Sequence, residues 1–178
     1  LVREEGPPTV AIAYDAKGEF DLERLQKRFF ASADQLVTLR MFSGMNRQNY
    51  AQARRLGIRI TTESNAAGPD FEAFLNEKLI GPDVTFNHCQ GWPDSVWQRV
   101  KDWGATVNVC PRSDAQYGLG EGVFAFQQAL DHGMTPGFSI DNEVSYGTDM
   151  FTEMRVAFYF QRGLARNAAF RGEPNPPA

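Results

Sequence analysis

The stretch that decides the fold is residues 83–110, DVTFNHCQGWPDSVWQRVKDWGATVNVC. Its two ends, Val84–Cys89 and Ala105–Cys110, are near-continuous apolar runs of strand length, a pattern typical of strands that are covered on both faces. Between them, a helical pattern starts at Asp94 and stops at Gly104, where a glycine can adopt the left-handed conformation that ends helices. A strand, a helix and a second strand with this spacing predict a parallel βα unit.

The same alternation continues on both sides of this unit. The expected strands are Thr9–Ala13, Gln35–Met41, Ile58–Thr62, Val84–Cys89, Ala105–Cys110 and Gly137–Asp141. The expected helices follow Asp21, Asp70 and Asp94, include Phe124–Leu130, and end with Asp149–Arg162. Thr148 can cap the last helix, and its apolar stripe is expected to face the core through Phe151, Met154, Ala157 and Phe158.

Parallel βα units can form a closed barrel or an open doubly wound sheet. An eight-fold barrel takes about 250 residues and at least about 200, whereas this chain has 178. The chain is therefore too short for a closed eight-fold barrel and fits five or six βα units, as in an incomplete TIM-barrel-type fold or an open sheet over residues 1–171, followed by a mobile tail at 172–178. An open flavodoxin-like binding domain is not favoured, because no glycine-rich phosphate loop follows any expected strand.

The composition is that of a globular protein with no basic surface. Apolar residues make up 42% of the chain, its net charge is −4 and its pI is about 5.2, which argues against nucleic-acid and anionic-membrane partners. No apolar run approaches the roughly 20 residues that span a bilayer. Cys89 and Cys110 fit no zinc knuckle or redox pair, so we expect free buried thiols and a cytoplasmic location.

Polar residues that can bind a metal or transfer protons recur where the expected strands end. The strand-end segments are Glu63-Ser64-Asn65, Asn87-His88-Cys89, Cys110-Pro111-Arg112-Ser113-Asp114 and Asp141-Asn142-Glu143. Taken alone, His88 could be a core histidine bonded to a carbonyl, Asp141 a turn cap, and Glu63 a solvated loop residue. Because parallel strands bring their carboxyl ends to one edge, their recurrence favours a shared site. Imidazole and carboxylate groups bind zinc or iron(II) and move protons near neutral pH.

Three segments, in this order and spacing, resemble a known family. They are VTFNHC at 84–89, GATVNVCPRSD at 104–114 and ALDHGMTPGFSIDNEVSYGTDMFTEMRVA at 129–157. Together they look like the C-terminal half of the metal-dependent amidohydrolase superfamily, in the branch of cytosine deaminase and the triazine hydrolases. The resemblance covers roughly residues 50–165 and implies a (β/α) barrel portion from about the third strand to the eighth.

The resemblance also implies roles for particular residues. Asp141 would be the last-strand carboxylate that contacts zinc or iron(II) and takes a proton from the attacking water. His88 would lie beside the metal and polarise or hydrogen-bond the substrate, and Glu63 stands where the family usually has a histidine ligand. The candidate substrate contacts are Asn87, Ser113 and Asn142.

The implied activity is metal-dependent hydrolysis of a non-peptide C–N bond in a small nitrogenous compound, by deamination or amide hydrolysis. The His-x-His pair of the family's first strand is absent from this sequence, whose two histidines are His88 and His132. We therefore expect that the chain alone does not hold the metal tightly, and that it self-associates or pairs with a complementing chain. The alternative is a non-catalytic, degenerate amidohydrolase-like domain that binds a ligand or a partner chain.

Overall fold

The computed structural model describes residues 9–13, 22–32, 34–64, 69–117, 123–141, 147 and 149–173, with the backbone alone at 9–13 and 69–70. Six strands form one parallel sheet in the order β1-β2-β3-β4-β5-β6. They are β1 (Thr9–Ala13), β2 (Thr38–Phe42), β3 (Arg59–Ser64), β4 (Val84–His88), β5 (Thr106–Val109) and β6 (Gly137–Phe138). The strand order never reverses, as it would in a doubly wound sheet, so the prediction of TIM-barrel-type units is confirmed.

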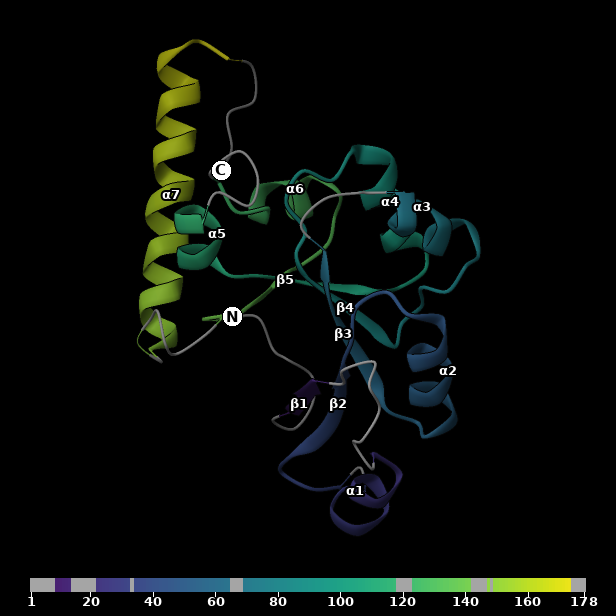
Figure 1. The fold of residues 1–178 in the computed structure, drawn as a ribbon. Coiled ribbons are helices and arrows are strands. Elements are labelled where there is room, and N and C mark those ends of the chain that lie inside the picture. Colours follow the sequence, from purple (N-terminus) through teal and green to yellow (C-terminus); the bar gives the residue numbers. More distant parts are fainter. Residues whose placement is uncertain are drawn as a thin grey trace.

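The helices connect the strands and cover the sheet on its outer side. They are α1 (Leu22–Phe29), α2 (Arg47–Arg55), α3 (Pro69–Asn76), α4 (Asp94–Asp102), α5 (Pro111–Tyr117), α6 (Phe126–Asp131) and α7 (Met150–Phe170). Helices α2, α3 and α4 lie on the same side of the central strands, while α5 and α7 lie side by side at the far end (Figure 1). The result is a curled half-barrel, which is the incomplete barrel that the sequence predicts.

The two faces of the sheet differ in chemistry. The face toward the helices is apolar and buried, and its strand residues include Met41, Ile60, Val84, Phe86, Val107 and Val109. On the opposite face, Arg40 Nη1 donates to Thr61 Oγ1 at 3.1 Å and to Thr85 Oγ1 at 2.7 Å. Thr85 Oγ1 in turn lies 2.7 Å from Thr106 Oγ1. Successive side chains of a strand point to opposite faces of the sheet. The same strand register therefore aligns apolar residues on the face toward the helices and polar residues on the inner face.

An aromatic cluster anchors the carboxyl ends of β3 and β4. The ring centroid of Trp92 lies 5.1 Å from that of Phe86, 5.3 Å from Phe71 and 4.9 Å from Trp97. Trp92 Nε1 also donates to Ser64 Oγ, the last residue of β3, at 3.0 Å. Because aromatic pairs add to ordinary area burial, this cluster fixes the strand ends beside which the polar residues gather.

Helix α7 departs from the sequence prediction in both its start and its buried face. It begins at Met150 with Asp149 as N-cap, whose side chain accepts from the Phe151 N–H; Thr148, the expected cap, lies outside the described residues. The predicted core-facing stripe is wrong at three of its four positions, because Phe151, Met154 and Phe158 are 69%, 46% and 58% exposed. Ala157 is buried as predicted, and the other buried positions of the helix are Glu153, Gln161 and Ala168.

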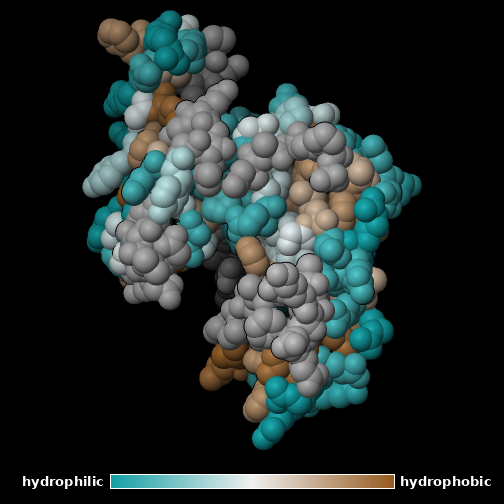
Figure 2. Space-filling view, in the orientation of Figure 1, coloured by the Kyte–Doolittle hydropathy of each residue, from teal (hydrophilic) through white to brown (hydrophobic). Residues whose placement is uncertain are grey.

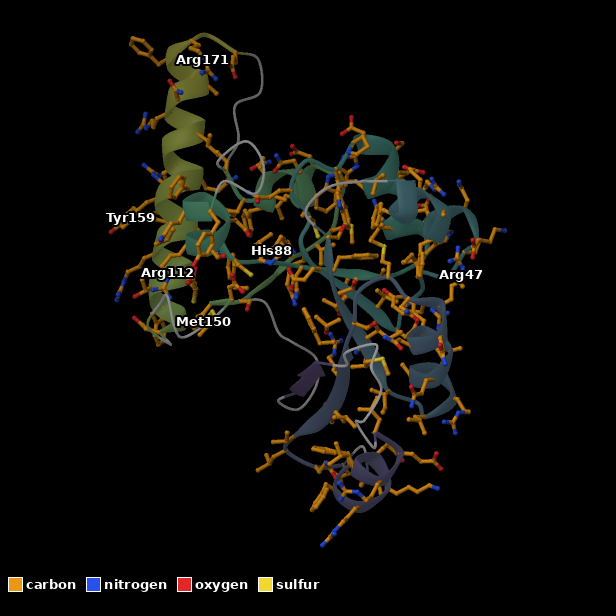
Figure 3. All side chains as sticks on the ribbon, in the orientation of Figure 1. Arg47, His88, Arg112, Met150, Tyr159 and Arg171 are labelled. Atoms are coloured by element: carbon orange, nitrogen blue, oxygen red, sulfur yellow. The ribbon has the colours of Figure 1, made fainter. Side chains whose placement is uncertain are left out.

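The physical reason is an ion pair that fixes the rotation of α7. Glu153 is fully buried against Arg112 of α5, and this contact turns the apolar stripe away from the sheet. Brown, apolar surface is accordingly visible along α7 in the space-filling view (Figure 2), and Tyr159 points away from the body of the molecule (Figure 3). Within the described part of the chain, no helix is long and apolar enough to cross a membrane.

Helix α7 also continues to Phe170, beyond the expected end at Arg162, and the differences at the strand boundaries are smaller. Strand β2 starts at Thr38 rather than Gln35, and β6 ends at Phe138 rather than Asp141. The parallel ladder stops at Phe138 because its partner β5 ends at Val109 and α5 begins at Pro111; Asp141, three residues further on, has a φ of 68°, outside the strand region. Residues 174–178 of the expected mobile tail lie outside the described residues, and its mobility and the domain limit at residue 171 stay predictions.

Candidate active site

Unusual backbone conformations mark the ends of two strands. Four non-glycine residues among those described have a positive φ, namely Lys78 (55°), His88 (69°), Cys89 (57°) and Asp141 (68°). Three of the four lie at or just beyond the carboxyl ends of β4 and β6. Such conformations cost about 1–3 kcal/mol each and concentrate at functional sites. The backbone therefore points to the same edge as the side-chain chemistry.

His88 lies at the end of β4, near the middle of the molecule (Figure 3), and its ring spans two carboxylates. Its Nδ1 atom is 2.6 Å from Asp114 Oδ1, and its Nε2 atom is 2.6 Å from Glu63 Oε2. The side chain of His88 is 5% exposed and that of Asp114 is 0% exposed, whereas Glu63 is 43% exposed. Asp114 thus fixes the ring from the interior, and Glu63 meets it on the solvent side.

These contacts determine the charge of the ring. Burial by itself would lower the pKa of His88, because it disfavours the charged form. The hydrogen bonds to Asp114, Cys110 and Glu63 outweigh burial and raise the pKa of His88 to about 12. Burial would likewise raise the pKa of Glu63, but the hydrogen bond and positive charge of His88, together with the hydrogen bond from Asn87, outweigh burial and lower that pKa. At neutral pH, therefore, His88 is an imidazolium with a proton on each nitrogen, and Glu63 is ionised.

The raised pKa of His88 predicts how the free energy of unfolding changes with pH. In the folded state the pKa of His88 is about 12, against 6.5 for the ordinary side chain. The protonated ring of His88 therefore makes its full contribution to the free energy of unfolding below pH 6.5. That contribution is lost as the pH rises from 6.5 toward 12. We expect the difference in free energy of unfolding between the metal-free protein and its His88→Asn variant to shrink between pH 6 and pH 9.5, as measured by urea unfolding. A difference that stays constant or grows would contradict this charge state.

Asp114 was part of a strand-end segment that the sequence singled out, but sequence reasoning chose Ser113 alone from it. The signal that could have found Asp114 is Pro111, because proline favours the first helical position and α5 begins there. Asp114 then falls in the first turn, where its Oδ2 atom accepts from the Cys110 N–H at 3.0 Å. Its other oxygen is thereby directed at His88.

Cys89 and Cys110 are free and buried, as expected. Burial raises the pKa of the Cys110 thiol, while the hydrogen bond and the positive charge of His88 act in the opposite direction. The negative charges of Asp114 and Asp141 also act on this thiol and raise its pKa. Cys110 therefore lies within electrostatic reach of both His88 and Asp141, the two residues for which catalytic roles are expected.

Asp141 reaches the same helical turn from β6. Its Oδ2 atom accepts from Ser113 Oγ at 2.5 Å, and its N–H donates to Ser139 Oγ at 3.1 Å. Ser113 is fully buried and Asp141 is exposed. His88 and Asp141 thus contact successive residues of α5, Asp114 and Ser113, which brings their segments together at the strand-end edge.

A row of amides continues the polar network across the strands. Asn87 Nδ2 donates to Glu63 Oε1 at 3.2 Å, and Asn108 Nδ2 donates to Asn87 Oδ1 at 3.3 Å. Asn108 was missed from sequence, although its register opposite Asn87 in β4 and β5 follows from the strand alternation. Asn142, the remaining candidate substrate contact, lies outside the described residues.

The expected metal ligands, Asp141 and Glu63, do not assemble a complete site by themselves. A catalytic zinc site normally has three protein ligands, yet an oxygen of Asp141 accepts from Ser113 and one of Glu63 faces His88. Over the described ranges, the three-residue group of metal-ligating side chains within reach of a common ion contains neither of them. The described residues therefore do not complete the metal position that the resemblance implies.

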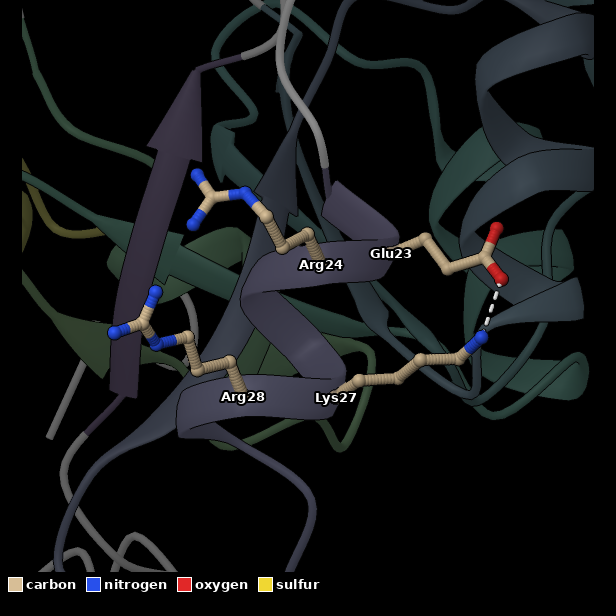
Figure 4. Close-up of a pocket in the computed structure, with 4 residues that line it drawn as sticks. All are labelled: Glu23, Arg24, Lys27 and Arg28. Carbon is tan, nitrogen blue, oxygen red and sulfur yellow. Dashed lines mark hydrogen bonds and ion pairs between the residues drawn. The ribbon is translucent and has the colours of Figure 1, made fainter.

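An open pocket on α1 is a separate feature. It is lined by Glu23, Arg24, Lys27 and Arg28, and Lys27 Nζ is paired with Glu23 Oε1 at 2.7 Å (Figure 4). Helix α1 lies at the end of the molecule opposite α7 (Figure 1). The pocket is therefore a charged helix surface that is distinct from the strand-end edge.

Two curated proteins match part of the sequence. The chain is 33% identical over 94 residues to a 5-methylthioadenosine/S-adenosylhomocysteine deaminase from Pyrococcus abyssi, an alignment that covers 52% of the chain and 20% of that protein. It is 35% identical over 101 residues to the protein of the same name from Pyrococcus furiosus, covering 56% and 22%. The chain therefore spans about a fifth of the length of these relatives. No family model matches it.

Solved structures share the fold. An adenosine deaminase from Xanthomonas campestris with bound zinc superposes with a TM-score of 0.65 at 15% identity, over 79% of this chain and 36% of that one. A triazine hydrolase variant gives 0.64 at 18% identity, over 83% and 36%. An amidohydrolase from a Sargasso Sea sample gives 0.61 at 22% identity, over 80% and 35%. With about a third of residues identical over half of the chain, the chain is similar to these deaminases, and it shares, as a partial barrel, the fold of the solved amidohydrolases.

Proposed function

We propose that the protein hydrolyses a C–N bond of a small nitrogenous compound, by deamination or amide hydrolysis, at the strand-end edge around His88. The observation that carries the proposal is the ring of His88, whose two nitrogens each lie 2.6 Å from a carboxylate. Such a ring is oriented through both nitrogens, and Glu63, the carboxylate on its Nε2 atom, is 43% exposed. It is the arrangement that a hydrogen-bond donor to a substrate atom requires.

Each remaining residue has a proposed task at this edge. His88 donates its Nε2–H to a polar atom of the substrate that takes the place of Glu63. Asp141, whose carboxylate is held by Ser113 at 2.5 Å, takes one proton from the attacking water as the water oxygen bonds to the substrate carbon, and later releases it to the product or to solvent. Glu63, ionised and 43% exposed, takes the second proton of that water and delivers it to the leaving nitrogen as the C–N bond breaks. We also propose that Asp141 and Glu63 contribute to the metal position, whose remaining ligands lie beyond the described residues.

Substrate binding is proposed to use the polar groups next to these residues. Asn87 offers a carboxamide that already contacts Glu63, and Asn108 extends the same row. Ser113 offers a buried hydroxyl beside Asp141. Asn142 completes the proposed set. Amides and hydroxyls both donate and accept hydrogen bonds, which suits a ring that carries nitrogen atoms and an amino group.

The names of the curated relatives suggest where to begin the substrate test. The protein, expressed from its complete gene and supplied with Zn²⁺, is incubated with 5-methylthioadenosine, S-adenosylhomocysteine, adenosine, cytosine and an aminotriazine. Release of ammonia is measured with a coupled assay, and a chelator-treated sample is the control. We expect release from at least one compound of the adenosine type. If none of the five yields ammonia above the chelator control, the proposed hydrolysis is wrong.

The open barrel also leads to a proposal about assembly. Strands β1 and β6 are the outer strands of the sheet, and unpaired strand edges readily pair with another chain. We propose that the protein self-associates or pairs with a complementing chain that covers them. Light scattering coupled to size-exclusion chromatography measures the mass of the particle, and a monodisperse monomer across micromolar concentrations would exclude self-association.

A further inference from the structure

His88, Cys110 and Asp114 bring a nitrogen, a sulfur and an oxygen donor together in one buried place. They come from the end of β4, the residue after β5 and the first turn of α5. All three are buried, and their ligand atoms all lie within 4.8 Å of one another. We infer that these residues form a metal site of their own, which binds Zn²⁺ or a similar borderline-soft divalent cation through His88 Nδ1, Cys110 Sγ and Asp114 Oδ1.

The spacing of the donor atoms suits zinc. Zinc binds nitrogen and oxygen at about 2.0–2.2 Å and sulfur at about 2.3 Å, and tetrahedral geometry then places the donors about 3.3–3.6 Å apart. The cluster already lies within 4.8 Å. The 2.6 Å separation of Nδ1 and Oδ1 needs to open by only about 0.7 Å to admit the ion in place of a proton.

The surroundings of the cluster are those of a supported metal site. A ligating histidine usually donates its other N–H to a carboxylate, and a ligating carboxylate is itself hydrogen-bonded. Here the Nε2 atom of His88 lies 2.6 Å from Glu63 Oε2, and Asn87 orients Glu63. The second oxygen of Asp114 accepts from the Cys110 N–H at 3.0 Å. Glu63 and the Cys110 N–H, the two supporting partners, are therefore in place before an ion binds.

The charges also balance. A thiolate and a carboxylate carry two negative charges, and a divalent cation beside neutral imidazole cancels them. Imidazole, thiolate and carboxylate are together a donor set that zinc accepts, whereas Mg²⁺ and Ca²⁺ prefer oxygen ligands alone. The cluster therefore selects for zinc-like ions and against the hard cations.

This site is distinct from the proposed catalytic metal position, because it uses neither Asp141 nor Glu63 as a ligand. It also does not rest on the proposed hydrolysis: an inactive protein would contain the same three donors.

Cobalt(II) is the probe, because thiolate ligation gives a sulfur-to-cobalt charge-transfer absorption in the near ultraviolet. Metal-free protein in a thiol-free reductant is titrated with Co²⁺, and Zn²⁺ is then added. We expect a charge-transfer band that saturates at one equivalent and is bleached by Zn²⁺, while Mg²⁺ leaves it unchanged. Cobalt binding without this band, or no binding at micromolar Co²⁺, overturns the inference.

The chain supplies a matched control, because its only other cysteine, Cys89, is also buried and lies outside the cluster. The Cys89→Ser variant should keep the band, which assigns it to Cys110 even if Cys110→Ser does not fold. A folded Cys110→Ser variant should lose the band and bind Co²⁺ at least about tenfold more weakly. Loss of the band in Cys89→Ser with retention in Cys110→Ser would contradict the assignment.

A second variant separates ligands from supporting residues. Glu63→Gln should keep the band, because Glu63 contacts the ring of His88 rather than the ion. Its affinity for Co²⁺ should fall by about 10–100-fold, the usual effect of removing a supporting carboxylate. In the zinc-loaded wild-type protein, X-ray absorption should show one sulfur neighbour, and a zinc shell without sulfur would refute the site.

Discussion

Replacing Glu153 by alanine is expected to lower the free energy of unfolding by about 3–5 kcal/mol, the usual cost of removing one partner of a buried ion pair. Glu153 is fully buried, and its Oε1 atom contacts the guanidinium of Arg112, which is 19% exposed. Its Oε2 atom also accepts from the Arg112 N–H at 3.2 Å. The variant therefore takes the balancing carboxylate away from a half-buried guanidinium and from the first turn of α5.

Two controls make this result specific. Glu173 pairs with Arg171 on the surface, with 46% and 56% of the side chains exposed, so Glu173→Ala should change stability by less than about 1 kcal/mol. The double replacement Arg112→Met with Glu153→Leu should cost much less than the single change, because no buried charge is left. Urea unfolding measures all three. If Glu153→Ala lies within 1 kcal/mol of the wild type, the pair does not have this structural role.

The same pair connects the fold to the proposed active site. Arg112 Nη2 donates to the Gly147 carbonyl at 2.7 Å, so α5, α7 and Gly147 are connected at one point. The residues next to Arg112 on α5 are Ser113 and Asp114, which contact Asp141 and His88. A loss of this tie is therefore expected to misplace the polar residues as well as to destabilise the chain.

Most of the strand pattern could be predicted from sequence. Val84–His88 and Thr106–Val109 are short, apolar and bounded by clear turns, and such runs are unambiguous when helical patterns separate them. The choice of a barrel over an open sheet depended on the family resemblance and on the absence of a glycine-rich phosphate loop from the sequence, because strand order is a long-range property. Helix α2 was weakly marked, since its sequence RQNYAQARR is mostly polar. Its cap, Asn46, accepts from the Asn49 N–H at 3.0 Å, a local signal that was overlooked.

The candidate site could be predicted only in part. Strand ends identify His88 and Asp141 as residues of one edge, because that argument needs only the strand pattern. The contact between His88 and Asp114 could not be predicted so directly, since it depends on where α5 starts and which way its first turn faces. The burial of Glu153 was equally hidden, because an acid in an amphipathic helix is expected to face solvent.

The second large effect is expected in catalysis, from replacing His88 by asparagine. An oriented proton donor contributes about 10²–10⁴-fold to rate, and the ring of His88 is oriented by carboxylates 2.6 Å from each nitrogen. Asparagine keeps a polar side chain but cannot present the oriented Nε2–H of the ring. We therefore expect kcat/KM for the best substrate of the ammonia-release assay to fall by about 10²–10⁴-fold.

The second histidine of the chain is the matched control. His132 lies at the end of α6, where its Nε2 atom is 3.1 Å from Asp94 and its ring stacks on Trp97 with centroids 5.9 Å apart. Neither Asp94 nor Trp97 is a proposed active-site residue, so His132→Asn should leave kcat/KM unchanged. Urea unfolding of both variants confirms that each is folded under the assay conditions.

The ratio of these two effects tests the central claim most directly, namely that hydrolysis takes place at the strand-end edge around His88. The measurement is the rate of ammonia release by the wild-type, His88→Asn and His132→Asn proteins at subsaturating substrate. The predicted result is a loss of about 10²–10⁴-fold in His88→Asn alone. Wild-type kcat/KM in a folded His88→Asn variant, or an equal loss in His132→Asn, would contradict the claim.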